Sequence, residues 1–329
     1  MPISHFVTFV ASLVGTASLC RAALPALRRA FLVTPVARSS HVEATPQGGG
    51  VIVAPLALAI AWFALLSSGW KPERFGASLT LALLALVVLG CRDDLVGLSA
   101  RFRFVVQTGA AGLALATLPA ASQPILGWLP PFVAALILVV GVLWFINLTN
   151  FMDGIDLISV TQFVPAFVTI AWLLPGDSAT GLVCVAFAGA LVGFATLNRP
   201  PARLFLGDSG SLPLGLLGAA GALVVAGERG IIVAALPFAY YAADATLTLA
   251  RRALAGEKVW EAHKQHFYQR ALQRLTIGQI VLRVGACNVL LCGAAVIVAN
   301  QGVAAHYAAV VFGAGVVALL LRDLGRERT

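Results

Sequence analysis

One carboxylate stands between two long apolar segments, in the stretch Arg203-Leu-Phe-Leu-Gly-Asp208-Ser-Gly-Ser211-Leu-Pro-Leu-Gly215. Its glycines and serines let main-chain N–H groups approach an anion closely, while Asp208 offers a hard oxygen ligand of the kind that Mg²⁺ binds. Taken alone, the stretch is also compatible with an ordinary turn between two membrane helices. The rest of the chain decides between a turn and a site.

The composition is that of a membrane protein. Of the 329 residues, 60% are hydrophobic and 11% are charged, whereas soluble proteins carry about 25% charged residues. The formal net charge of +8 is therefore first a signal of membrane topology, and no nucleic-acid-binding motif occurs. The five cysteines are odd in number and form no C-x-x-C pair, so we expect neither a disulfide framework nor a zinc site.

Apolar runs long enough to cross a bilayer as helices recur along the chain. They predict an all-α, polytopic membrane protein with about eleven spans, forming a single transmembrane domain over residues 1–329. The first run lacks a basic start and a cleavage site, so we interpret it as a retained span and not a signal peptide. The predicted spans are 3–20, 50–68, 76–91, 103–120, 131–150, 157–174, 181–197, 211–227, 230–249, 277–299 and 304–321.

The basic residues predict the orientation. With the N-terminus outside, the inner loops hold eighteen lysines and arginines, and the outer loops hold Lys71, Arg74 and Arg229. The positive-inside rule then places the N-terminus in the periplasm and the C-terminus in the cytoplasm. Because every dense polar cluster lies on the inner side, we expect the function to lie at the cytoplasmic face of the membrane.

The first inner loop contains Thr45-Pro46-Gln-Gly48-Gly49-Gly50. Thr-Pro favours an extended turn, and glycine-rich backbone at the start of a helix can receive a phosphate or sugar oxygen. A flexible loop before a span is the alternative interpretation.

The second inner loop carries two adjacent carboxylates, Asp93 and Asp94. At a membrane boundary such a pair is costly unless a cation or arginines compensate its charge. Arg92, Arg101 and Arg103 are near enough in sequence to do so. The functional alternative is a metal–phosphate site in which one acid orients or deprotonates a substrate oxygen.

The third inner loop contains Asn147, Asn150, Asp153 and Asp156. If the fifth span stays helical to its end, the first three recur every three residues and share one face. Two amides and two acids with no basic neighbour in the loop indicate an external cation. Capping of the next helix by Asp153 or Asp156 is the alternative.

The longest inner loop contains His263, His266 and Arg270. On a helix these three would form one hydrogen-bonding face suited to a pyrophosphate or prenyl phosphate. A basic amphipathic helix lying on anionic membrane lipids is the alternative. Asp244, in the ninth span, either pairs with an arginine or faces a polar cavity.

Together these clusters resemble the polyprenyl-phosphate N-acetylhexosamine-1-phosphate transferases, glycosyltransferase family 4, over roughly residues 41 to 270. Their order is also that of the family. The matching pieces are Thr45-Pro46 with the glycines, Asp93-Asp94-x-x-Gly97-Leu98, Asn147-x-x-Asn150-x-x-Asp153-Gly-x-Asp156, Phe205-Leu-Gly-Asp208-Ser-Gly-Ser211 and His263-x-x-His266.

The chain departs from the family pattern at two places. Glu43 stands close to where a basic residue usually precedes Thr-Pro, and His263-Lys-Gln-His266 replaces a three-histidine cluster. The second variant, preceded by a stretch that includes Trp260 and Glu261, is similar to the subgroup that starts O-antigen (lipopolysaccharide) or capsular glycans, and less so to the phospho-N-acetylmuramoyl-pentapeptide transferases.

The resemblance implies transfer of N-acetylhexosamine-1-phosphate from a UDP-sugar to undecaprenyl phosphate, with release of UMP. It implies a Mg²⁺ ion, with Mn²⁺ as a substitute, held by Asn150 and Asp208. Asp93 and Asp94 would lie at the lipid phosphate, and Asp153 and Asp156 near the nucleotide. Thr45, Gly49, Asn147, His263, His266 and Arg270 are the candidate substrate- and phosphate-binding residues, and dimers are common among relatives.

Two mechanisms remain open on the sequence. A phosphate monoester has its second pKa near ~6, so the lipid phosphate is already largely a dianion and needs no strong general base. We therefore favour direct in-line attack, with Asp93 or Asp94 as a covalent nucleophile the alternative. A transporter or flippase is the competing function, but transporters tend to place charged residues near the bilayer midplane, whereas here Asp244 is the only acid inside a predicted span.

Overall fold

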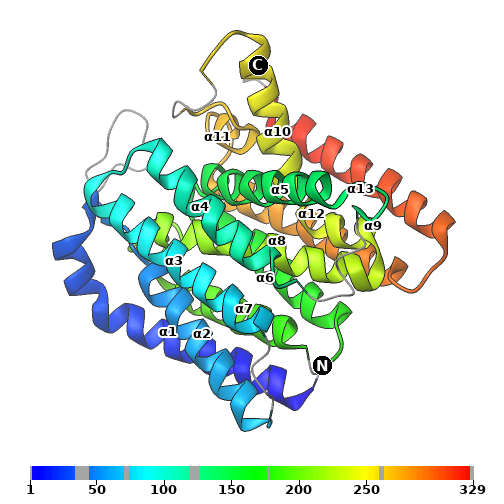
Figure 1. Cartoon of the computed structure of the whole chain (residues 1–329). Coiled ribbons are helices and arrows are strands. Elements are labelled where there is room, and N and C mark those ends of the chain that lie inside the picture. Colours follow the sequence, from blue (N-terminus) through cyan, green and yellow to red (C-terminus); the bar gives the residue numbers. More distant parts are fainter. Residues whose placement is uncertain are drawn as a thin grey trace.

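The computed structural model describes residues 2–33, 44–69, 74–118, 126–176, 178–258 and 263–326. It is a bundle of helices that run side by side, as Figure 1 shows, and the expected all-α class is confirmed. The elements are α1 (Ile3–Ala30), β1 (Leu32–Val33), β2 (Thr45–Pro46), α2 (Gly50–Ser67), α3 (Arg74–Val96), α4 (Ala100–Leu115), α5 (Pro131–Met152), α6 (Ile158–Leu173), α7 (Ala179–Asn198), α8 (Asp208–Arg229), α9 (Ile231–Ala235), η2 (Leu236–Phe238), α10 (Ala239–Leu254), α11 (Phe267–Ala271), α12 (Ile277–Val298) and α13 (Val303–Leu324).

Each predicted span corresponds to a helical segment, but the lengths differ from prediction. Nine segments in the described ranges are long and apolar enough to cross a membrane, while α4 and α6 have only 16 residues each. Helix α1 continues for ten residues beyond its apolar run and reaches 28 residues, about 42 Å at 1.5 Å per residue. The charged end of a helix need not stay within the hydrocarbon, so the apolar run underestimates the helix.

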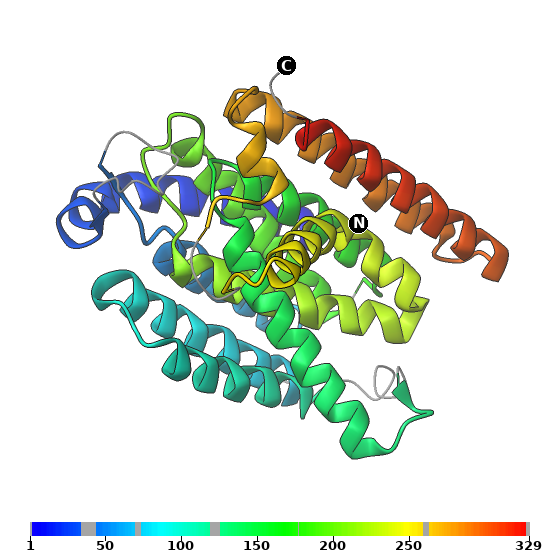
Figure 2. The same ribbon diagram turned by 90° about the horizontal axis from the view of Figure 1, so that it is seen from above.

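Helix α8 lies at the centre of the bundle, where it packs against α2, α3, α5, α6 and α7. The residues that begin this helix are therefore surrounded by the ends of its neighbours. Figure 2 shows α3 and α4 as a pair on one flank of the molecule and α12 and α13 as a pair on another.

The predicted ninth span is broken into α9, η2 and α10. Pro237 lacks an N–H group and cannot continue the α-helical ladder. Its carbonyl accepts a hydrogen bond of 2.8 Å from Nε2 of the buried Gln162 in α6, which satisfies a backbone group inside the bundle. The break sends α10 toward the border of the molecule where α11 lies (Figure 1).

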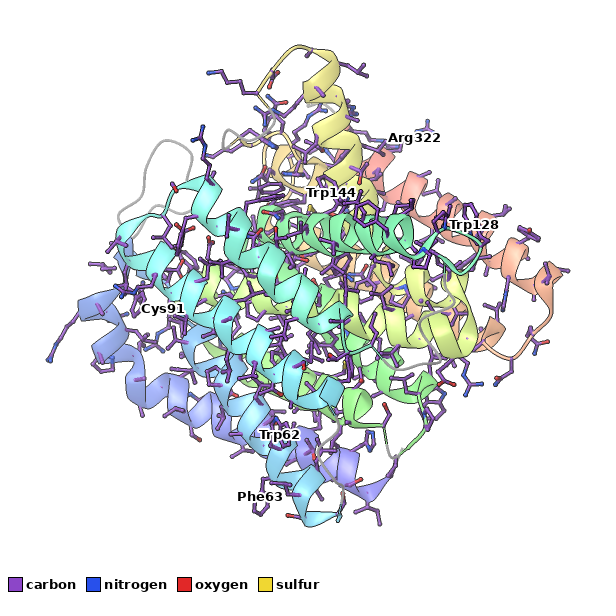
Figure 3. All side chains as sticks on the ribbon, viewed as in Figure 1. Trp62, Phe63, Cys91, Trp128, Trp144 and Arg322 are labelled. Atoms are coloured by element: carbon purple, nitrogen blue, oxygen red, sulfur yellow. The ribbon has the colours of Figure 1, made fainter. Side chains whose placement is uncertain are left out.

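The two ends of the bundle differ in character. Because consecutive long helices alternate in direction, α3 and α5 end at the same side at which α2, α4 and α8 begin. Figure 3 shows Arg322 near the upper border, and Trp62 and Phe63, at the far end of α2, near the lower border. The predicted polar clusters thus share one end of the molecule.

Candidate active site

The site is built around the first turn of α8. The loop before it is held by the buried Asn198, whose Oδ1 accepts from the Leu157 N–H at 2.8 Å and whose Nδ2 donates to the Leu204 carbonyl at 3.0 Å. The loop ends at Gly207, where φ is 73° and a Cβ atom would lie 2.5 Å from Oδ2 of Asp94. Only glycine suits both conditions, and it brings Asp208 to the helix start.

Asp208 meets Asn150 of α5. Nδ2 of Asn150 lies 2.7 Å from Oδ1 of Asp208 and 3.0 Å from Oγ of Ser211. The predicted contact between these two residues, 58 positions apart, is therefore present. Ser211 joins the group because it stands three residues after Asp208 on one helix face. Metal binding by the pair stays a prediction.

Asp93 is bound by an arginine. Its Oδ2 lies 2.7 Å from Nη1 of Arg103, and its Oδ1 accepts from the Leu98 N–H at 2.6 Å. The same Arg103 nitrogen lies 3.8 Å from Oδ2 of Asp208. Arg103 therefore connects two of the predicted acids, as the compensation alternative anticipated for Asp93, and it places a positive charge beside Asp208.

The Asp94 carboxylate has different partners from that of Asp93. Its two carboxylate oxygens accept from the backbone N–H groups of Asp208, at 3.0 Å, and Ser209, at 3.2 Å. A carboxylate at the start of a helix satisfies N–H groups that have no partner within the helix and complements the helix dipole. Asp94 thus caps α8 from another helix and fixes where Asp208 begins.

Backbone hydrogen bonds join the glycine loop to the loop that precedes α8. The Phe205 N–H donates to the Pro46 carbonyl, and the N–H groups of Gly49 and Gly50 donate to the carbonyls of Phe205 and Leu206, all at 2.9 Å. The Gly49 N–H is therefore not available to a phosphate here, contrary to its expected use. Thr45, in β2, is buried beside this junction.

Gly50 is the glycine of this junction at which an added side chain would collide most severely with backbone. A Cβ atom on Gly50 would collide with the backbone of Gly210 in α8. We expect Gly50→Ala to cost about 1–3 kcal/mol or more through overpacking, seen as a lower Tm in detergent and loss of activity. Gly109→Ala in α4 is the matched control, because nothing lies within 4 Å of its added methyl group. A Gly50→Ala protein with unchanged Tm would contradict the tight junction.

The polar residues of the third inner loop have different hydrogen-bond partners. Helix α5 ends at Met152, so Asp153 is its C-cap residue and not part of the helix itself. Asn147 donates to Oε1 of Gln107 in α4 at 2.8 Å, and Asp153 accepts from the Ser159 hydroxyl at 2.6 Å. Burial, only partly opposed by that hydrogen bond, raises the pKa of Asp153 to about 6.

Asp156 ties this loop to the loop before α8. The carboxylate is almost wholly buried, and its Oδ2 accepts from the Ala202 N–H at 3.0 Å. Neither Asp153 nor Asp156 occupies the N-cap position of α6, which is Leu157. Of this motif, Asn150 alone contacts Asp208 directly among the described residues.

The prediction that His263, His266 and Arg270 lie on one helix is wrong. His263 precedes α11, His266 is its N-cap residue, and Arg270 lies within it. The two imidazole rings nevertheless stack, with centroids 4.8 Å apart. An extended approach to a short helix, and not a single helix, brings them together. Glu43, Trp260 and Glu261, which the sequence comparison singled out, lie outside the described residues.

His263 is expected to affect stability in acid. Burial, and then the nearby charges of His266 and Arg252, lower the pKa of His263 to about 4, against about 6.5 in an unfolded chain. Between these values the unfolded chain binds more protons, so the folded state loses stability as pH falls through this window. We expect His263→Gln to reduce the fall in Tm between about pH 7 and pH 5. Equal falls in both proteins would contradict this.

Comparison with known proteins identifies the family of the chain. Residues 77–226 match the model of glycosyl transferase family 4, a range that includes the acids at 93, 94, 153, 156 and 208. A phospho-N-acetylmuramoyl-pentapeptide-transferase of Synechococcus sp. (strain JA-3-3Ab) is 33% identical over 68% of this chain and 69% of its own length. The chain belongs to glycosyl transferase family 4.

A second kind of family 4 relative is similar to the chain as well. A probable undecaprenyl-phosphate N-acetylglucosaminyl 1-phosphate transferase of Bacillus subtilis (strain 168) is 29% identical over 72% of this chain and 68% of its own length. A phospho-N-acetylmuramoyl-pentapeptide-transferase of Desulforamulus reducens is 30% identical over 57% of this chain and 63% of its own. These relatives are phospho-sugar transferases, and as a family 4 member the chain is an enzyme.

Proposed function

We propose that the protein transfers N-acetylhexosamine-1-phosphate from a UDP-sugar to undecaprenyl phosphate. The products are UMP and the lipid-linked diphosphate sugar that begins a cell-surface glycan. The observation that carries this proposal is the contact between Asn150 and Asp208, with Arg103 and Asp93 beside it, at the ends of α5 and α8. An acid, an amide and an arginine at a membrane boundary suit a substrate made of a diphosphate and a lipid.

The donor set fits a Mg²⁺ ion. Asp208 and Asn150 offer two oxygens once the Asn150 amide turns by about 180°, and Ser211 lies within hydrogen-bonding distance of that amide. In the described ranges, no group of three or more His, Cys, Asp or Glu residues could hold an ion alone. Mg²⁺ commonly takes one or two protein ligands and completes its shell with water and substrate phosphates. Bound there, the ion would polarise the diphosphate and stabilise departing UMP.

The remaining residues would bring two anions together. Arg103 supplies positive charge beside Asp208, and His263, His266 and Arg270 would receive phosphate groups. The lipid phosphate needs little deprotonation, so direct in-line attack is the proposed reaction. Stoichiometric release of UMP in the absence of lipid would instead support a covalent intermediate on Asp93 or Asp94.

A hydrophobic cavity near the site could hold the prenyl chain. It has a volume of about 370 Å³ and is lined by apolar residues of α5, α8, α9 and α10, including Gly141, Phe145, Ala222 and Ala242. Phe145 stands five residues before Asn150 on α5, about 7.5 Å along the helix axis. A lipid seated in the cavity would thus have its phosphate end near the acids.

The orientation proposed from the basic residues places this site at the cytoplasmic face of a bacterial inner membrane. UDP-sugars are cytoplasmic metabolites, so the proposed donor is available on that side. Assembly as a homodimer is part of the proposal by analogy with the family.

A second candidate is transfer of phospho-N-acetylmuramoyl-pentapeptide, because relatives with that name match the chain at 33% identity. The His263-Lys-Gln-His266 variant favours the hexosamine reaction. Purified protein should be incubated with undecaprenyl phosphate, Mg²⁺ and each of several UDP-sugars, including UDP-N-acetylmuramoyl-pentapeptide, while UMP is measured. We expect release with a UDP-N-acetylhexosamine that depends on both lipid and Mg²⁺. Release with the pentapeptide donor alone would select the second candidate, and no release with any donor would favour a transporter.

A further inference from the structure

The carboxylate of Asp244 is the most heavily hydrogen-bonded acid of the described chain outside the site. It is fully buried in α10, and five donors converge on it. Oδ1 receives His266 Nδ1 at 3.2 Å, the Phe267 N–H at 3.0 Å and the Thr248 hydroxyl at 3.4 Å. Oδ2 receives the Tyr240 hydroxyl at 3.1 Å and the Tyr268 N–H at 3.3 Å. No arginine is among these donors, so the first of the two alternatives for Asp244, an arginine partner, is not found, and the histidine loop supplies donors instead.

These contacts bind two segments that lie 22 to 24 residues apart in sequence. Tyr240 and Thr248 belong to α10, whereas His266, Phe267 and Tyr268 form the start of α11. Helices α10 and α11 lie next to each other at the upper border of Figure 1. The carboxylate therefore fixes the place and direction of the loop that carries the two histidines.

The orientation of the His266 ring is restricted on three sides. Its Nδ1 is used by Asp244, one face stacks on His263 with centroids 4.8 Å apart, and Tyr268 stacks at 5.8 Å. With Nδ1 and the ring faces engaged, Nε2 is the ring nitrogen left to meet a substrate, which must reach a side chain that is almost wholly buried here. The carboxylate at Nδ1 also selects the tautomer, as second-layer acids do for other functional histidines.

The same loop is linked to the acid site. The hydroxyl of Tyr268 donates to the Phe151 carbonyl at 3.1 Å, and Phe151 follows Asn150 in α5. A Cβ atom on Gly154 would collide with that hydroxyl, so the loop lies directly on the turn after α5. Asp244 thus sets the position of His266 relative to the Asn150–Asp208 pair through an unbroken series of contacts.

We propose that Asp244 is a positioning residue that holds His266 with its Nε2 edge directed at the phosphate of the lipid acceptor. This inference rests on the proposed function. When a phosphate dianion approaches Nε2, the ring takes up one proton from solvent at that nitrogen. The imidazolium then donates to the phosphate from Nε2 and to Asp244 from Nδ1. The buried carboxylate balances the charge of the ring, which a neutral amide in its place cannot do.

The test uses the full-length protein in detergent with Asp244→Asn, His266→Gln and the double variant. Loss of a charge-assisted hydrogen bond corresponds to about 10- to 100-fold, so we expect Asp244→Asn to lower kcat/KM for undecaprenyl phosphate by that factor. The KM for the UDP-sugar should change less than about twofold. In the His266→Gln background, Asp244→Asn should add less than about twofold, because the acid acts through the histidine.

Two controls separate positioning from general damage. Thr248→Val removes another donor to the same carboxylate, and Asp323→Asn removes an acid that lies 3.0 Å from Nε of Arg283 near the end of α13. Both should keep near-normal kcat/KM. Multiplicative losses in the double variant, or an equal loss in Thr248→Val, would overturn the proposal and leave a purely structural role.

A measurement without turnover distinguishes this inference from the proposed reaction. Hydrogen exchange of the Phe267 and Tyr268 amides should accelerate in Asp244→Asn and stay unchanged in Asp323→Asn, because Asp244 accepts from both N–H groups. Unchanged exchange would refute the positioning role whatever the substrate. Faster exchange in a protein that releases no UMP would retain the role of Asp244 in holding the loop and refute the proposed reaction instead.

Discussion

Replacing Asp208 with asparagine is expected to lower kcat on the order of 10²–10³-fold, the usual effect of removing one preorganised electrostatic group. Asparagine keeps the shape of the side chain and can still accept from Asn150 at this position. It removes the negative charge that a cation would require. The expected signature is therefore a folded protein with a normal Tm that needs a higher Mg²⁺ concentration for any remaining UMP release.

The control for this variant is Asp323→Asn, which also changes a carboxylate that lies near a helix end and close to arginine. Asp323 lies near the end of a membrane helix and forms ion pairs with Arg283 at 3.0 Å and Arg274 at 3.6 Å, far in sequence from the site. Asp323→Asn should retain its Mg²⁺ dependence, because it changes an ion pair and no candidate ligand. An Asp208→Asn protein with full activity and the normal Mg²⁺ requirement would refute the site.

The sequence was a good guide to the helices and to the Asn150–Asp208 contact. Long apolar runs have few alternatives in a membrane, because every backbone group must be bonded within the segment. Once the directions of the helices alternate, the end of α5 and the start of α8 must share a side. The family resemblance then implied the particular pair, Asn150 and Asp208, and the contact between them is present.

The roles of Asp94 and of the glycines depended on contacts that no local pattern contains. Asp94 accepts from residues 114 and 115 positions later, and Gly50 is constrained by the backbone of α8. Adjacent aspartates look equivalent in a sequence, yet successive residues on a helix point about 100° apart. The direction of each carboxylate is therefore decided by the neighbouring helices.

The histidine loop shows a different limitation. Spacing of three and four residues predicts one helical face only if the segment is helical throughout. Here α11 begins after His266 because Asp244, more than twenty residues earlier, accepts the N–H groups of its first turn. The signal available in the sequence was an acid in a membrane span, which is costly unless it has partners. Assigning those partners required the fold.

The alanine variants of Asp93 and Asp94 are expected to differ in stability, although the two residues are neighbours in the chain. Asp94→Ala leaves the buried start of α8 without the acceptor for two N–H groups, and loss of a helix cap costs about 0.5–2 kcal/mol. Asp93→Ala removes an ion pair with Arg103, which is 36% exposed, and such pairs contribute only about 0–1 kcal/mol. It also removes the acceptor of the Leu98 N–H, but this group lies between the exposed Gly97 and Ser99, where water can replace the carboxylate. We therefore expect Asp94→Ala to have the lower Tm.

Both alanine variants should lose activity, but for different reasons. Without Asp94, the backbone that carries Asp208 is no longer fixed against Asn150. Without Asp93, Arg103 is released toward Oδ2 of Asp208, 3.8 Å away, and neutralises the charge that a metal ion would need. Adding Arg103→Gln to Asp93→Ala should then restore part of the Mg²⁺ affinity, whereas Arg103→Gln should not help Asp94→Ala. Rescue of Asp94→Ala by Arg103→Gln, or a lower Tm for Asp93→Ala than for Asp94→Ala, would contradict these roles. Asp94 would then not be the residue that fixes the start of α8, or Asp93 not the one that holds Arg103.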